Sequence, residues 1–303
     1  MKRYIITIIV AALASAAGVS AQSVSGGGSA MSFSVFPRDV RFLSMGGVDI
    51  LDNVAAAPLS KEKIDAQASY TMFALSSACA SADINASAGV KLGSRLAVKA
   101  FFSNDKASDS YSVIDDTGVA SRASYTPSDM FVGGGAAFAI IPEKLSLGAD
   151  VRYMKSSLTK KVSYTATSFD IVAAYKTGAL TAAAGVNSLG SAEIAGSSEY
   201  ELPTSVMLGA EYAGNFGSST FVGAAQVNCF FKGGLRAGVG AEYGFKDMLF
   251  ARVGYNFGGK TAIPSFLSLG IGAKFFGVSL NAAYLISDMG AGNTISAGLG
   301  FSF

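Results

Sequence analysis

The chain lacks two residue types that many catalytic and binding sites use. Among its 303 residues there is no histidine and no tryptophan, and there are only two cysteines. Histidine is the commonest general base and the commonest metal ligand in proteins. No other nucleophile and base stand at a recognisable spacing. The sequence therefore predicts a protein that is not an enzyme and that has no cofactor or metal site.

Charge and long apolar runs are also scarce. Only 15% of the residues are charged, although 50% are hydrophobic, whereas soluble domains have about 25% charged residues. After the first 21 residues the chain has no run of the roughly 18 apolar residues that a membrane helix needs. An exported chain this apolar without such runs is typical of a transmembrane β-barrel, in which apolar residues alternate with polar ones.

The first 21 residues have the pattern of a secretory signal peptide. Two positive residues at 2–3 precede an apolar stretch at 4–14, and small residues at 19–21 provide a cleavage site. Cleavage would remove two positive charges and leave the mature chain with about zero net charge. A neutral chain has no general attraction for nucleic acid, so we expect no nucleic-acid partner.

Period-two alternation runs through most of the mature chain. In the C-terminal run NTISAGLGFSF, every second residue from Ile295 to Phe303 is apolar, and the residues between them are small or polar. Segments of about ten residues with this period match strands that cross a bilayer. The predicted strands are 64–74, 80–92, 95–103, 129–141, 145–157, 162–176, 179–187, 204–213, 218–231, 235–244, 248–257, 265–275, 278–286 and 294–303.

These strands predict an all-β fold, a transmembrane antiparallel β-barrel of about 14 strands, in the bacterial outer membrane and surrounded by its lipid. Short connections alternate with longer ones, such as 104–128 and 188–203, as periplasmic turns alternate with extracellular loops. This parity places both mature termini on the periplasmic side. Phe303 would then face lipid at the inner interface. A last strand that ends in an aromatic residue also resembles the signal read by the barrel assembly machinery.

Residues 22–63 precede the first strand and show no sustained alternation. A barrel of fourteen strands is wider than one that side chains alone can fill. We therefore expect three parts: the signal peptide at 1–21, an N-terminal plug or hatch at 22–63, and the barrel at 64–303.

The alternation also predicts which ionisable residues face the lumen. Acids and bases are balanced there, which favours paired charges that brace the lumen, and that hold the plug through Arg38, Asp39 or Arg41, over a ring of one sign in an ion-selective pore. The predicted lumen residues are Asp65, Asp83, Asp150, Asp170, Glu211, Glu242, Lys91, Lys99, Arg152, Arg236, Arg252 and Lys274.

Three consecutive glycines, Gly133, Gly134 and Gly135, fall inside the fourth predicted strand. Glycine within a strand often marks a bulge or a close approach. They predict a strand kink, which would either give the plug room or open a lateral window to lipid. The two cysteines, Cys79 and Cys229, fall on strands from opposite sides of the barrel, so we expect both to be unpaired.

A family resemblance is carried by the stretch FPRDVRFLSMGGV. Its residues Pro37, Arg41, Met45, Gly46 and Gly47 resemble the P-x-A-R-A-x-x-M-G-G motif of the PorV/PorQ family of Bacteroidetes outer-membrane proteins. The stretch LPTSVMLGAEY at 202–212 is similar to a strand opening of the same family. The chain departs from the family after the motif, where Asn-Val-Ala-Ala-Ala-Pro at 53–58 stands in place of Asn-Pro-Ala.

The resemblance implies a barrel related to FadL-type transporters, which have fourteen strands and an N-terminal hatch. It also implies two candidate functions. In the first, the protein is an accessory of type IX protein secretion whose partners are secretion-system proteins or exported cargo. In the second, it is a FadL-like passive transporter whose partners are small hydrophobic compounds.

Overall fold

The computed structural model of the protein describes residues 31–73, 80–108, 111–114, 120–157, 163–194, 198–232, 234–258, 264–287 and 293–303. The predicted signal peptide, the first part of the predicted plug (22–30) and Cys79 lie outside the described residues. Within the described ranges, no helix is both long and apolar enough to cross a membrane.

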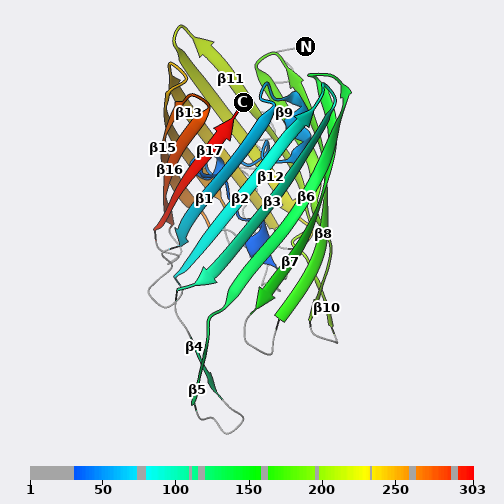
Figure 1. The fold of residues 1–303 in the computed structure, drawn as a ribbon, viewed down its shortest axis with the longest axis vertical. Coiled ribbons are helices and arrows are strands. Elements are labelled where there is room, and N and C mark those ends of the chain that lie inside the picture. Colours follow the sequence, from blue (N-terminus) through cyan, green and yellow to red (C-terminus); the bar gives the residue numbers. More distant parts are fainter. Residues whose placement is uncertain are drawn as a thin grey trace.

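Fourteen of the described strands form a closed antiparallel barrel (Figure 1). Barrel neighbours follow the chain order, and β1 pairs with β17 to close the sheet, which confirms the predicted fold. The strands are β1 (Ile64–Phe73), β2 (Ser81–Leu92), β3 (Leu96–Ala107), β6 (Ser128–Ile141), β7 (Leu145–Ser157), β8 (Ser163–Thr177), β9 (Leu180–Ile194), β11 (Ser205–Phe216), β12 (Ser219–Phe230), β13 (Gly234–Phe245), β14 (Leu249–Phe257), β15 (Phe266–Phe275), β16 (Val278–Ser287) and β17 (Thr294–Ser302).

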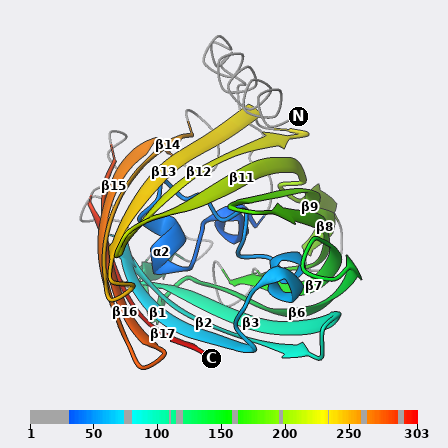
Figure 2. The same ribbon diagram turned by 90° about the horizontal axis from the view of Figure 1, so that it is seen from above.

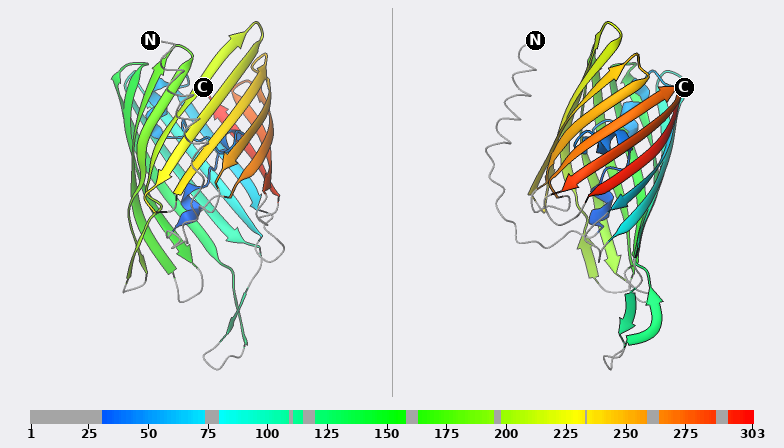
Figure 3. Two further views of the ribbon diagram at one scale, coloured as in Figure 1. Left: turned by 180° about the vertical axis from the view of Figure 1, so that it is seen from behind. Right: turned by 90° about the vertical axis from the view of Figure 1, so that its left-hand side faces the viewer.

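The two longest expected loops contain more strand than the sequence predicted. β3 and β9 run past their expected ends at residues 103 and 187, and the short strand β10 (Ser198–Glu201) pairs with the extended β9. Between β3 and β6, a hairpin of β4 (Tyr111–Ile114) and β5 (Ala120–Tyr125) projects from the barrel (Figures 1 and 3). Beyond the bilayer both faces of a strand meet water, so apolar and polar residues need not alternate there and the pattern no longer predicts the strand.

The two ends of the barrel differ in the way that the sequence predicted. The short turns, such as those after β2, β6 and β8, lie at the end that holds the C-terminus, and the β4–β5 hairpin projects from the other end (Figure 1). At the first end, the backbone N–H of Phe303 donates to Ile64 O at 2.9 Å, and the N–H of Ile64 donates to Phe303 O at 2.7 Å. The last residue thus completes the pairing of β17 with β1.

Large apolar side chains cover the outside of the barrel. Along β14 the outward Val253 is 46% exposed, while its neighbours Arg252 and Gly254 face the lumen and are buried. On β15 the outward Ile271 is 68% exposed, and Phe303 at the end of the chain is 59% exposed. A continuous apolar exterior of this kind is what the hydrocarbon layer requires of a barrel.

The N-terminal residues 31–63, called here the luminal segment, run through the inside of the barrel (Figure 2). The segment contains three short helices, η1 (Ser32–Val35), α2 (Val40–Leu43) and η2 (Val54–Leu59). The Asp39 carboxylate caps α2 by accepting the backbone N–H groups of Arg41 and Phe42, and Asn53 caps η2 through Ala56 N. The side-chain caps stabilise these helices, which are too short to show the periodic apolar pattern by which a helix is usually recognised in a sequence.

No register shift accompanies the three glycines of β6, at which a strand kink was predicted. Pairing with β3 and β7 is continuous through Gly133–Gly135, and the register shift in β6 lies between Ala139 and Ile141 instead. A Cβ at Gly133 would lie 2.5 Å from the Phe101 ring, and one at Gly135 would collide with the Asp150 carboxylate. The inward-facing Gly133 and Gly135 therefore make room for neighbouring side chains without an interruption of the pairing.

Candidate functional site

Glycines on one wall of the lumen form a seat for the luminal segment. A Cβ added at Gly240 would lie 2.4 Å from Met45 O, and one added at Gly254 would lie 2.0 Å from Gly46 N. The backbone N–H of Gly46 donates to Ser268 Oγ at 2.9 Å. The segment therefore lies backbone to backbone against β13, β14 and β15, which only residues without a Cβ permit.

Two motif residues have the left-handed backbone that this turn requires. Gly46 has φ +73° and Gly47 has φ +68°, a region that other residues rarely adopt. The Gly47 carbonyl accepts a hydrogen bond from the Arg236 guanidinium, and Arg236 Nε also donates to Asn256 at 2.9 Å. Pro37 and Met45 of the same motif are buried in the described structure.

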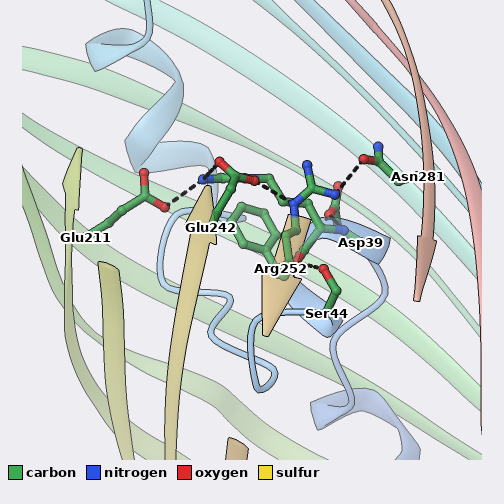
Figure 4. A network of polar contacts seen from close by, with 8 residues as sticks. Asp39, Ser44, Glu211, Glu242, Arg252 and Asn281 are labelled. Atoms are coloured by element: carbon green, nitrogen blue, oxygen red, sulfur yellow. Dashed lines mark hydrogen bonds and ion pairs between the residues drawn. The ribbon is translucent and has the colours of Figure 1, made fainter. Parts of the chain in front are cut away.

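Arg41 joins the luminal segment to two acids of the barrel wall, one of them on the same strand as Gly240 of the glycine seat. Its Nε lies 3.0 Å from Glu242 on β13, and its Nη2 lies 3.1 Å from Glu211 on β11. Glu242 also pairs with Arg252 at 2.5 Å, and Arg252 donates to Asn281 at 2.8 Å. Figure 4 shows this chain of contacts, which runs along the inner face of the wall from β11 to β16. Glu242 is therefore shared by two arginines and is itself buried.

Burial and neighbouring charges shift the pKa values of Asp39 and Arg41 in the luminal segment. Burial raises the pKa of the Asp39 carboxyl to about 6, and the charge of Asp52 acts in the same direction, against the N–H of Phe42 and the charge of Arg41. For Arg41, burial favours the neutral form, but Glu242 and Glu211 outweigh it and raise the pKa above its ordinary value. Arg41 thus stays charged.

A second arginine contact lies nearer the hairpin end. Arg38 Nη1 is 3.0 Å from Asp83 on β2, with both side chains buried, and Ser103 Oγ donates to the same carboxylate at 2.5 Å. Arg152 on β7 pairs with Asp170 on β8 at 2.8 Å and donates to Ser34 O at 3.3 Å. Both guanidinium groups lie over the Phe131 ring.

Four wall lysines reach the last part of the luminal segment. Lys99 Nζ lies 2.5 Å from the Asp52 carboxylate, and Lys274 Nζ lies 3.9 Å from Glu62. Lys91 donates to Ser60 O at 2.9 Å, and Lys176 donates to Leu59 O at 3.0 Å. Three of the four were among the predicted lumen residues. Lys176 was not, although it shares the parity of Asp170 on the same strand.

Several uncharged wall residues that contact the segment were also missing from the prediction. Gln226 donates to Asp49 at 2.6 Å, and Ser146 donates to the Ala55 carbonyl. Their inward parity was readable from the alternation. Nothing in the sequence distinguished them from other polar lumen residues, because their partners lie on a segment without periodicity.

The described residues line a large and a small cavity beside the luminal segment. A vestibule of about 790 Å³ lies at the end with the short turns, where it is bordered by Gly178 and Ser302. A smaller inner cavity of about 130 Å³ lies between the segment and the wall of β1–β3 and β6–β9. Among the predicted lumen residues Asp65, Lys91, Glu211, Glu242, Arg252 and Lys274 line the vestibule, Asp150, Arg152 and Asp170 line the inner cavity, and Lys99 lines both.

An apolar cluster fills the lumen near the start of the described chain. Met31 packs with Phe131 and Met154 of the wall and with Leu202 of the connection between β10 and β11, and Phe33 lies against this cluster, with its ring centroid 6.4 Å from that of Phe131. The remaining members are Ala166 and Ala192, with Phe101 and Tyr164 at the edge. The lumen thus contains an apolar surface that the chain's own N-terminal side chains cover.

Three remaining expectations concern metal binding, the cysteines and Phe303. Among the described residues, no group of three or more acids and cysteines is placed to hold a metal ion. Cys229 is free and exposed. The role of Phe303 in assembly stays a prediction.

Comparison with known proteins identifies relatives by fold alone. No protein-family model and no curated protein matches the sequence. Among solved structures, the monoaromatic hydrocarbon channel CymD matches with a TM-score of 0.60 at 12% identity, over 89% of this chain and 98% of that one. The toluene transporter TbuX of Ralstonia pickettii matches with a TM-score of 0.59 at 13% identity, over 89% and 99%.

The toluene transporter TodX of Pseudomonas putida is a third such structure, with a TM-score of 0.56 at 13% identity, over 88% of this chain and 99% of that one. At these identities the likeness concerns the fold. Membership of the PorV/PorQ family stays a prediction. By its fold and its apolar exterior, the chain is an outer-membrane β-barrel of fourteen strands, and it shares its barrel fold with these three proteins.

Proposed function

We propose that the barrel is a passive conduit for small hydrophobic compounds across the outer membrane. The observation that carries this proposal is the apolar cluster inside the lumen, where Met31 and Phe33 of the luminal segment cover Phe131 and Met154 of the wall and Leu202 beside it. An apolar surface of this kind in an otherwise polar lumen suits a guest that gains free energy by leaving water.

A guest would occupy the place that Met31 and Phe33 fill. The exchange replaces one set of apolar contacts with another, so it needs little net free energy and leaves transport reversible. The luminal segment would act as the hatch of this conduit, because Arg41 and the glycine seat hold its middle part while its first residues lie at the cluster. The similarity in fold to two toluene transporters and a monoaromatic hydrocarbon channel supports the same class of substrate.

Uptake of radiolabelled toluene by cells that produce wild-type or variant protein tests the proposal. Met154→Gln keeps the side-chain size but buries an amide in the cluster, and an unpaired buried amide costs about 1–3 kcal/mol. We expect slower toluene uptake at low toluene concentration. The matched control is Leu43→Gln, which buries the same amide in the separate cluster between α2 and β15–β16.

Both variants must reach the outer membrane in equal amounts, which heat-modifiable migration on gels measures. If Met154→Gln takes up toluene as fast as wild type, or if Leu43→Gln is slowed equally, the cluster is not the site of passage and the proposal fails.

The second candidate is an accessory of type IX protein secretion. It rests on the motif at Pro37, Arg41 and Met45–Gly47, and on the β4–β5 hairpin, which projects from the barrel where a protein partner could reach it (Figure 3). Affinity purification of the barrel from membranes distinguishes the two candidates. Secretion components that co-purify with wild type and are lost when the hairpin is removed would favour this one.

A further inference from the structure

The wall that carries the apolar cluster also has a polar surface beside it. The luminal segment lies against the glycines of β13–β15, and the wall of β1–β3 and β6–β8 opposite carries polar inward side chains next to Phe101 and Phe131. Gln67, Ser87, Lys99 and Asp150 belong to this wall and line the inner cavity. Toward the hairpin end the polar row continues, because Asp83 stands opposite Asp105, and Asp105 opposite Asp129, on β2, β3 and β6.

The vestibule and the inner cavity meet at a small set of residues. Both cavities are lined by Asp52, Asn53, Gln67 and Lys99. The Asp52–Lys99 ion pair, at 2.5 Å, joins the luminal segment to β3 at this boundary, and Lys99 also donates to Asp52 O at 3.1 Å. This contact therefore lies at the boundary between the vestibule of about 790 Å³ and the inner cavity of about 130 Å³.

The inner cavity has the chemistry of a space that holds water or a polar solute. Ser87 Oγ, Asp150 Oδ1 and Arg152 Nε are buried there and have no hydrogen-bond partner among the described residues. Buried polar atoms are otherwise almost always paired, by protein or by water. At ~30 Å³ per molecule, the cavity holds a few waters or one small solute. Its acids and bases are mixed, which favours no ion of one sign.

We propose that this wall forms a hydrophilic path beside the luminal segment, through which water and small uncharged or zwitterionic solutes pass. The Asp52–Lys99 pair closes the path on the vestibule side, and the Arg38–Asp83 pair closes it on the hairpin side. None of these four residues belongs to the apolar cluster, although Phe131 of that cluster also lines the inner cavity. The path is tested with polar solutes, so its outcome is distinguishable from that of the proposed hydrophobic transport.

Thiol accessibility in proteoliposomes tests the closure on the vestibule side, which the Asp52–Lys99 pair forms. In a chain with both native cysteines replaced by serine, Ser87→Cys places a thiol in the inner cavity. A small cationic methanethiosulfonate reagent, added from the side of the short turns, reports how easily a solute reaches it. Adding Lys99→Met removes the ion pair, and we expect a several-fold faster reaction. Asp52→Asn should act in the same way.

The matched control is Lys176→Met, which removes another wall lysine from the backbone of the luminal segment but lies away from the boundary between the cavities. It should leave the reaction rate of the thiol at position 87 unchanged. Exchanging the two charges, Asp52→Lys with Lys99→Asp, should restore the slow rate. Hydrogen exchange at residues 44–47 should match wild type in every variant, since the glycine seat is intact.

Passage itself is measured by osmotic swelling of proteoliposomes in a small uncharged sugar and in glycine. Because the two closures act in series, Lys99→Met and Asp83→Asn should each swell at nearly the wild-type rate, and the double variant should swell several-fold faster. Three results would overturn the proposal: an unchanged thiol reaction rate in Lys99→Met, an equal acceleration by Lys176→Met, or a folded double variant that swells no faster than wild type. If the double variant does not fold, the accessibility measurement still decides.

Discussion

At the residue scale, the position of the luminal segment is set by glycines on one wall, which leave space because they have no side chain. Backbone atoms of Met45 and Gly46 occupy the space that a Cβ of Gly240 or Gly254 would need. A flexible side chain could turn aside, but a backbone held by hydrogen bonds to the wall cannot. The fit is therefore sensitive to the smallest substitution available, which is alanine.

Replacing Gly254 with alanine should loosen the segment from its seat. The added methyl group would lie 2.0 Å from Gly46 N, and overpacking of this kind typically costs about 1–3 kcal/mol. Because about 1.4 kcal/mol corresponds to a factor of ten, we expect the amides of residues 44–47 to exchange roughly ten- to a hundredfold faster. Hydrogen exchange followed by mass spectrometry measures the rate.

The control for this change is Gly223→Ala on β12. A Cβ at Gly223 meets nothing closer than the Phe221 ring at 3.7 Å, so exchange at residues 44–47 should stay at the wild-type rate. Equal rates in the two variants would mean that the glycines of β13–β15 do not position the segment.

Glu242 is the residue whose loss should cost the most among the ion pairs of the lumen. Glu242→Gln removes the carboxylate that Arg41 and Arg252 share. Removing one partner of a buried pair costs about 3–5 kcal/mol, because the remaining charge stays buried. Urea unfolding in lipid vesicles measures the free energy. The control, Glu201→Gln, breaks the exposed pair with Lys232 and should cost less than about 1 kcal/mol.

At the element scale, the barrel was predictable from the sequence because a bilayer imposes alternation on every strand that crosses it. The predicted ranges match the observed strands closely where the two faces of a strand differ in polarity, as in β14 and β17. They fail at the outer parts of β3 and β9, where residues such as Asn104, Asp105 and Lys106 are polar on both faces. The backbones of these strands stay paired there, although their side chains no longer alternate between apolar and polar.

The contacts of the site were less predictable for a related reason. Alternation places Lys99 on the inner face, but its partner Asp52 lies 47 positions earlier, on a segment whose course no periodicity reveals. Likewise, Gly133–Gly135 resembled a kink, yet the space that they leave is taken by Phe101 and Asp150. Which side chain fills a given space depends on three-dimensional neighbours that a pattern along one strand cannot supply.

The β4–β5 hairpin should be dispensable for the barrel. Replacing residues 109–126 with an Asn-Gly turn keeps the bond from Ala107 N to Pro127 O and the pairing of β3 with β6. Exposed loop tips tolerate such changes, so the melting temperature and toluene uptake should equal those of wild type. A variant that fails to fold would show instead that the hairpin supports the sheet.

At the scale of the whole molecule, the luminal segment divides the lumen into an apolar part, a polar part and a vestibule. Removing residues 31–62, with the signal peptide and Lys63 kept, should join them into one water-filled pore, because fourteen strands enclose more space than their side chains fill. We expect a several-fold higher ion conductance in planar bilayers than for wild type. An equally low conductance would show that residues 31–62 do not act as a plug.

The same scale decides which face of the sheet meets lipid, since a shift of one residue would exchange the two faces of every strand. Spin labels at the outward Val253 and Leu269 should collide with oxygen dissolved in the bilayer and be shielded from a water-soluble nickel complex. A label at Gln67, which lines both cavities, should show the reverse. Water contact at Val253 together with lipid contact at Gln67 would mean that the inner and outer faces of the barrel have been assigned the wrong way round. The apolar cluster and the polar wall would then not face the lumen, and neither proposed route would be possible.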